Sequence, residues 1–83
     1  MLFMKLVEAI GVIGEYDRPD DAGHVTKEIN IIEWNEEYGP VLDIRKWQDG
    51  VPRRGISISE DELDAFFDAL QRAYPDRFWK KDY

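Results

Sequence analysis

The sequence has no cysteine and one histidine, His24. Without thiols the chain has no disulfide framework, no thiolate metal site and no cysteine nucleophile. A single imidazole makes a histidine-based zinc site or a serine–histidine hydrolase a poor fit. We expect His24 to be a loop residue without a functional role, and we expect neither a metal nor another cofactor.

Long apolar runs are also absent. Lys5 and Glu8 interrupt the most apolar stretch, so we expect no membrane-spanning segment and no membrane partner. The apolar residues 1–4 are too few for the core of a signal peptide. These features predict a cytoplasmic protein.

The length of 83 residues predicts one small domain over residues 1–83, with residues 76–83 as a C-terminal tail. An apolar fraction of 43%, including 13% aromatic residues, excludes a disordered chain. One core of this size is only just large enough to fold alone, so dimerisation would supplement it.

Positive charge is scarce, because 18 acidic residues against 11 basic ones give a net charge of −7. That sign is wrong for a protein that binds nucleic acid through a broad positive field. The segment 45–54 is the exception, since it holds four basic residues and one acid, Asp49. Both a local binding strip and a solvated hairpin rim fit this cluster.

β-branched residues and alternation predict strands at 3–15, 25–35, 41–47 and 54–58, with a bend at Gly11 in the first. Proline, glycine and aspartate predict loops between them, the first over residues 16–23. A capping box at 59–62 begins a helix that Pro75 ends. Its apolar stripe fits either a core against the sheet or a dimer interface. The candidate dimer residues are Phe66, Phe67 and Leu70.

Alternation in the third strand divides its side chains between two faces. Leu42 and Ile44 belong on the face that the helix covers, which leaves Asp43, Arg45 and Trp47 on the other face. Tryptophan beside arginine on an open sheet face is typical of a platform that stacks bases and binds phosphate. Trp34, at the end of the second strand, could add a second stacking ring. The alternative is that a partner subunit or the first loop covers both rings, while Asp43 and Arg45 form a salt bridge.

Catalysis is not expected. The paired carboxylates Glu36 and Glu37 lie on a turn, where no apolar pocket would raise a pKa for general acid–base chemistry. The chain also lacks a phosphate-binding glycine loop and a calcium-binding loop.

The segment Val41–Trp47 reads VLDIRKW, the segment Arg53–Ser59 reads RRGISIS, and an acidic-capped amphipathic helix follows. Over residues 25–72 this order resembles the positive cofactor four family of transcriptional coactivators, in particular its small, stand-alone bacterial (YdbC-like) branch. The pair Trp34–Asn35 before the core is similar to the pair found in that branch.

The resemblance implies an α+β fold, a curved four-stranded antiparallel sheet followed by a C-terminal helix, assembled as a symmetric dimer. It also implies binding of single-stranded or unwound nucleic acid along the sheets. The residues that the resemblance places at the nucleic-acid surface are Trp34, Arg45, Lys46, Trp47, Arg53 and Arg54.

Two departures from the family concern charge and length. The turn that is lysine-rich in the coactivator reads Glu36–Glu37 here, which removes phosphate contacts and adds repulsion. The basic and aromatic tail 77–81 has no counterpart; it fits either an extended nucleic-acid surface or a packed terminus.

These observations predict a nucleoid-associated, homodimeric protein that binds single-stranded DNA and acts in transcription regulation, replication or repair without catalysis. RNA as a ligand, and transcription or replication proteins as partners, stay open. The alternative is a protein-interaction module on the same fold, in which nucleic-acid binding has weakened.

Overall fold

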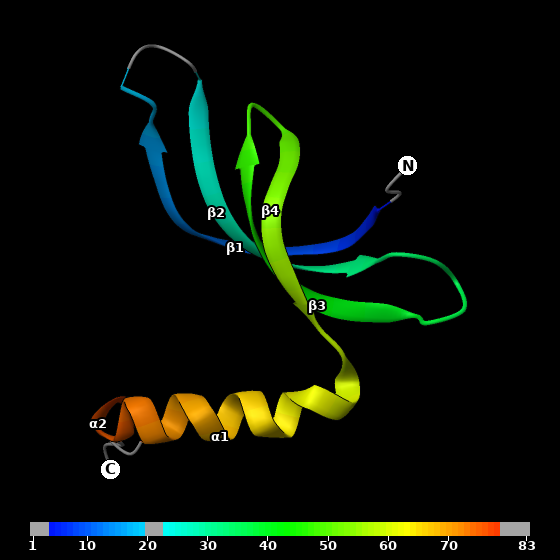
Figure 1. Ribbon diagram of the computed structural model, residues 1–83, viewed down its shortest axis with the longest axis vertical. Helices are drawn as coiled ribbons and strands as arrows, with labels where there is room; N and C mark the ends of the chain where they lie inside the picture. The colour runs from blue at the N-terminus through cyan, green and yellow to red at the C-terminus, as the bar shows by residue number, and fades with distance from the viewer. Residues whose placement is uncertain (1–3, 20–22, 79–83) are drawn as a thin grey trace.

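The computed structural model describes residues 4–19 and 23–78, which form one open antiparallel sheet followed by helices (Figure 1). The strand order β1-β2-β3-β4 pairs each strand with its neighbour in sequence. This arrangement confirms the predicted four-stranded sheet with a C-terminal helix. The elements are β1 (Lys5–Asp17), β2 (His24–Glu33), β3 (Pro40–Gln48), β4 (Val51–Ile58), the 3-10 helix η1 (Glu60–Glu62), α1 (Leu63–Ala73) and α2 (Pro75–Phe78).

The turn between β3 and β4 contains only Asp49 and Gly50, whose φ angles are 51° and 83°. Two central residues with positive φ are typical of the tight hairpin turn whose twist matches that of the strands. This turn starts β4 at Val51, earlier than the predicted residue 54. Pro52 is tolerated there because β4 is an edge strand.

β1 is bent by three irregularities in its pairing with β2, at Val7, Ile10 and Ile13. Each inserts one extra residue, and such bulges increase the bend and twist of a strand. The side chain of Asn30, which is 2% exposed, satisfies the amide of Ile10 at 3.2 Å. The predicted bend at Gly11 is therefore spread over three sites.

The predicted loop over residues 16–23 is too long, because β1 continues to Asp17 and β2 begins at His24. Tyr16 pairs with Val25 across the two strands. The backbone N–H of Arg18 donates to the carbonyl of Gly23 at 2.8 Å and closes the hairpin.

Strand register assigns side chains to two faces of the sheet. The network face carries Asp43 and Arg45 of β3, together with their partners on the neighbouring strands. The groove face carries Leu42, Ile44 and Lys46. Parity along β3 is therefore as predicted.

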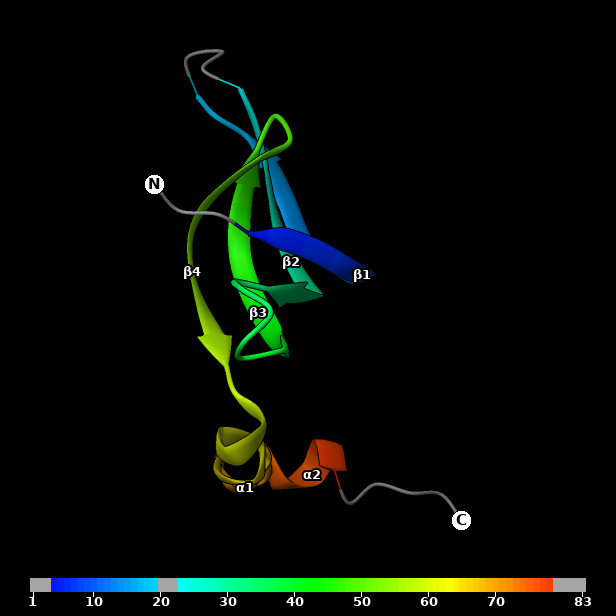
Figure 2. The same ribbon diagram turned by 90° about the vertical axis from the view of Figure 1, so that its right-hand side faces the viewer.

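The helical segment begins after Ser59, whose backbone N–H donates to the Glu62 carboxylate at 3.0 Å, as expected for a capping box. α1 ends at Ala73, and Pro75 begins the short helix α2. Both helices lie at one end of the sheet rather than across it (Figures 1 and 2).

Few side chains are buried in the described part of the chain, and none of these lies in α1. The Cα radius of gyration is 15.3 Å, whereas a compact domain of this length would have about 12 Å. Among the described residues, no helix combines the length and apolarity needed to cross a membrane. The buried apolar side chains are Val25, Ile32 and Ile58.

Candidate nucleic-acid interface

A basic groove of about 560 Å³ lies on the groove face, between the end of β1 and the first half of β4. β2 and β3 supply its floor, and β1 and β4 are the two edge strands of the curved sheet (Figure 1). Among the described residues, its lining contains four cations and no carboxylate. The lining residues are Tyr16, Arg18, Val25, Lys46, Gln48, Arg53, Arg54, Gly55 and Ile56.

The cations continue across the sheet in a row. Lys27 of β2 lies directly opposite Lys46 of β3. On the other side of Lys46, the register of β4 shifts, so that Arg53 and Arg54 together oppose this one residue. Like charges in directly opposite positions are destabilising unless an anion lies between them.

The groove cations have no counter-charges among the described residues. Arg18, Arg53 and Arg54 make no ion pair there, and Lys46 contacts only an aromatic ring. In a chain of net charge −7, this concentration of unpaired positive charge is the main electrostatic feature of the groove face.

Tyr16 supplies the aromatic ring of the basic groove. Its side chain is 48% exposed, and Nζ of Lys46 lies 6.0 Å from the ring centroid. Tyr16 and Arg18 were not among the predicted site residues, because their segment has the composition of a loop. Their spacing of two residues, which puts them on one face of an extended strand, is the signal that could have found them.

A buried polar network occupies the opposite face. The carboxylate of Asp43, which is fully buried, accepts hydrogen bonds from Nε and Nη2 of Arg45 at 2.6 and 2.7 Å. The hydroxyl of Ser57 donates to the same carboxylate at 2.8 Å. Nε1 of Trp34 donates to that hydroxyl at 2.9 Å, and the Arg45 guanidinium lies 5.2 Å from the Trp34 ring centroid. We call these four residues the Asp43 network.

The predicted stacking platform is therefore engaged in internal contacts. Arg45 covers the Trp34 ring, and its charge is paired with Asp43. Trp47 is half-buried opposite Thr26, and its Nε1 atom is buried without a hydrogen-bond partner among the described residues. Register places Arg45 and Trp47 on the face opposite Lys46, so the structure does not bring all six predicted site residues together.

The two faces are coupled at the edge strand. Nη1 of Arg45 donates to the carbonyl of Arg53 at 2.8 Å, which fixes the backbone of the groove wall. Gly55 lies against Arg45, and a Cβ atom on this glycine would overlap the Cβ of Arg45. The Asp43 network therefore positions the arginine pair at the edge of the basic groove.

His24 is not the unpartnered loop residue that was expected. It begins β2, and its ring nitrogens lie 2.7 Å from Asp17 Oδ1 and 3.1 Å from Glu15 Oε1. These hydrogen bonds raise the pKa of His24 above its usual 6.5, and the one to Asp17 has the larger effect. The ring lies on the face away from the basic groove, behind Tyr16.

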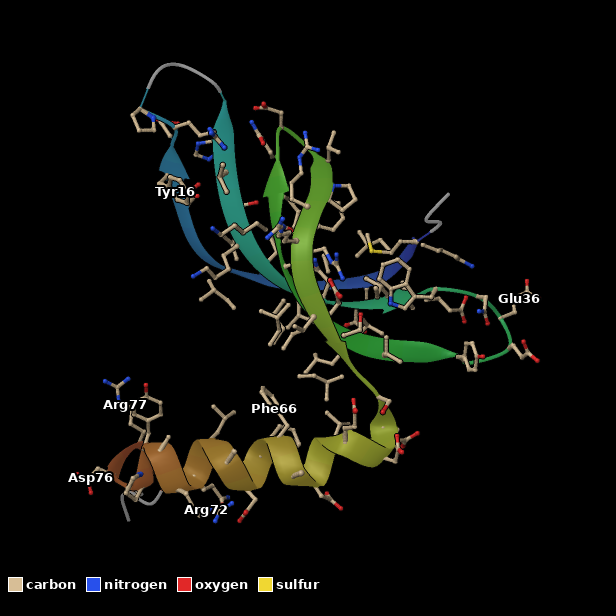
Figure 3. The ribbon with its side chains drawn as sticks, in the orientation of Figure 1. Tyr16, Glu36, Phe66, Arg72, Asp76 and Arg77 are labelled. Carbon is tan, nitrogen blue, oxygen red and sulfur yellow. The ribbon has the colours of Figure 1, made fainter. Side chains whose placement is uncertain are left out.

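The predicted dimer residues belong to a second, apolar region. Phe66 points from α1 toward the sheet, whereas Arg72 points away (Figure 3). A cavity of about 420 Å³ separates the helix from the sheet, with Leu63 and Phe67 on one side and Leu42 and Ile58 on the other.

The remaining expectations concern charge and the tail. Glu36 lies on the turn between β2 and β3 and does not line the basic groove (Figure 3). Arg77 lies in α2 with its guanidinium 5.8 Å from the Tyr74 ring centroid, and residues 79–81 of the tail lie outside the described residues.

Comparison with known proteins finds no matching family model, curated protein or solved structure. The residues of the basic groove are therefore the main guide to function.

Proposed function

We propose that this protein binds single-stranded nucleic acid in the basic groove, as a non-catalytic factor in transcription regulation, replication or repair. The observation that carries the proposal is the groove itself, whose described lining combines four cations and an aromatic ring with no carboxylate. This combination is typical of proteins that bind single strands through phosphate contacts and base stacking. It also agrees with the ligand that the resemblance to the positive cofactor four family implies.

A single strand fits better than a duplex because of Tyr16. The Tyr16 ring can stack on a base only if one face of that base is free. In a duplex the bases are stacked on one another, so their faces are not available to the ring. The phosphates would then follow the cations of the groove lining, from Arg18 through Lys46 to the arginine pair. DNA is the ligand proposed first, and RNA is a competitor in the test.

The role proposed for Arg45, Trp34 and Trp47 changes with the geometry. The internal contacts of Arg45 and Trp34 support positioning of the groove wall more directly than contact with the ligand, and Trp47 is half-buried on the face away from the groove. The direct contacts are assigned to Arg18, Lys46 and the arginine pair, with stacking by Tyr16.

We also propose a homodimer formed through the apolar region between α1 and the sheet. Phe67 is 49% exposed, and the cavity between helix and sheet is open. An isologous contact between two such regions would cover the same apolar patch on both subunits. The small core of the single chain makes this supplement to stability useful.

The test is fluorescence anisotropy of a labelled thymidine oligomer, with an unlabelled duplex and a uridine oligomer as competitors. We expect the duplex to compete weakly. Lys46→Glu should weaken binding on the order of tenfold or more, because it places a like charge against the phosphates. Lys5→Glu, which makes the same charge change outside the basic groove, is the matched control.

Two results would contradict the proposal. One is the absence of binding by the wild-type protein even at low salt. The other is an equal loss of affinity in the two variants, which would mean that the basic groove has no special role. A protein-interaction module would then be the better hypothesis.

A further inference from the structure

The hairpin end that carries Tyr16 is held from behind by one imidazole. Tyr16 lies between Glu15 and Asp17 on β1, and its side chain faces the basic groove while theirs face the other way. Both carboxylates reach the ring of His24 on β2, at 3.1 and 2.7 Å. The imidazole therefore bridges the two residues that flank the aromatic residue of the groove.

Protonation decides whether this bridge can be complete. A neutral imidazole carries one N–H and can donate to only one carboxylate, whereas the charged ring donates from both nitrogens. Among the described residues, the charged groups that hydrogen-bond to His24 are all carboxylates. Besides Glu15 and Asp17, Asp49 accepts a hydrogen bond from the His24 backbone N–H at 3.2 Å.

The bridge matters because this part of β1 has little other support. β1 is an edge strand whose residues are all exposed, and the bulge at Ile13 interrupts the ladder shortly before Tyr16. Among the described residues, the other interactions that hold this strand end are its pairing with β2, the Arg18–Gly23 hydrogen bond and the contact of the Tyr16 ring with Lys46.

We propose that His24 is a positioning residue for the basic groove: its charged ring clamps Glu15 and Asp17, fixes Tyr16 at the groove wall, and so tightens the binding of single-stranded nucleic acid as the pH falls. This inference rests on the proposed function. It adds proton-linked control to the same site.

The sign follows from the raised pKa of His24. The clamp is fully present below the ordinary pKa of about 6.5 and is lost as the pH rises through the raised value. Exposed ion pairs contribute little, so we expect affinity to change only about two- to fivefold. His24 is the chain's one histidine, and phosphodiesters do not titrate in this range.

The experiment measures the affinity for a thymidine oligomer from about pH 5.5 to about pH 8.5 at fixed ionic strength, a range centred on the histidine pKa. The wild type should bind more tightly at the acidic end. His24→Gln should bind weakly at every pH, because it cannot carry the charge. His24→Arg, which stays charged and can donate to both carboxylates, should bind tightly at every pH.

A second variant separates positioning from a general charge effect. In Tyr16→Leu, which keeps the phosphate contacts, the pH dependence should disappear if His24 acts through the ring. If the dependence persists unchanged in Tyr16→Leu, or is the same in the wild type and His24→Gln, the inference is wrong although the proposed function stands. Absence of binding in the wild type at every pH would instead overturn the proposed function.

The linkage between protonation and binding also predicts a reciprocal effect, which can be measured on the wild-type protein alone. If protonation of His24 tightens binding, the oligomer must raise the pKa of His24 by the same coupling. NMR titration of the imidazole, with and without saturating oligomer, measures this directly. An unchanged pKa in the complex would also overturn the inference.

Discussion

Replacing Arg53 and Arg54 by alanine should reduce the salt dependence of nucleic-acid binding by a calculable amount. Each phosphate neutralised on a single strand contributes about −0.7 to the slope of log affinity against log salt. The basic groove offers four cations, which predicts a slope of about −2.8. Raising the salt fourfold, from about 50 to about 200 mM, should then lower the affinity about 50-fold. The two cations that remain in the variant give a slope of about −1.4, so the same change in salt should lower its affinity only about sevenfold.

The assay is a salt titration of anisotropy with a labelled thymidine oligomer, repeated on a variant that carries Arg72→Ala and Arg77→Ala. This control loses the same charge, but its arginines lie on the helices and outside the basic groove (Figure 3). Its slope should match that of the wild type. Equal slopes in all three proteins would refute the assignment of phosphate contacts, and equal reductions in both variants would show that only net charge matters.

Three further predictions concern the fold. Light scattering at micromolar concentration should return twice the mass of the chain, and the mass of a single chain would refute the proposed dimer. Asp43→Asn should lower the free energy of unfolding by about 3 kcal/mol, because it breaks a buried ion pair with Arg45. Asp68→Asn, in an exposed pair, should cost about 0.5 kcal/mol or less, and similar urea midpoints for the two would contradict this difference. Gly55→Ala should lower the free energy of unfolding by about 1–3 kcal/mol, because its new Cβ atom would overlap Arg45. Gly11→Ala, whose Cβ atom would meet no atom within 4 Å, should not, and equal losses of stability in the two variants would refute the role of this contact.

Local signals in the sequence were sufficient for most of the fold. Alternation predicted the faces of β3, and the proline, glycine and aspartate clusters marked the turns. The capping box at Ser59 and the apolar spacing after it predicted the helix. Each of these signals depends on residues close together in the chain, which is why it can be recognised without the structure.

The course of β1 was harder to predict, because its bulges interrupt the alternation on which strand prediction depends. Val7, Ile10 and Ile13 recur every third residue, a spacing that belongs to neither a regular strand nor an amphipathic helix. The bulge at Ile10 is supported by Asn30, a residue on another strand. Nothing local in the sequence indicates that pairing.

The candidate site was only partly predictable, for the same reason. Lys46, Arg53 and Arg54 were found from local charge. Arg45 was predicted to contact nucleic acid, whereas in the structure it belongs to the Asp43 network. That place depends on Ser57, which contacts the Asp43 carboxylate, and on Trp34, which contacts the guanidinium; both come from elsewhere in the chain. A salt bridge to Asp43 is the alternative that the sequence leaves open, and the non-local contacts support it.

Net charge is a poor guide to this protein because the strands separate charges of opposite sign. Arg18 follows Asp17, and Lys27 precedes Glu28, so the sequence suggests that each positive charge is neutralised by its neighbour. On a strand, however, adjacent side chains point to opposite faces. Asp17 turns to His24, while Arg18 turns to the basic groove. The Debye length is about 8 Å at physiological salt, so a phosphate in the groove is influenced mainly by the side chains that line it. An acidic chain can therefore present a positive surface wherever β1, β2 and β3 keep their register, and a one-residue slip in that register would bring carboxylates into the groove.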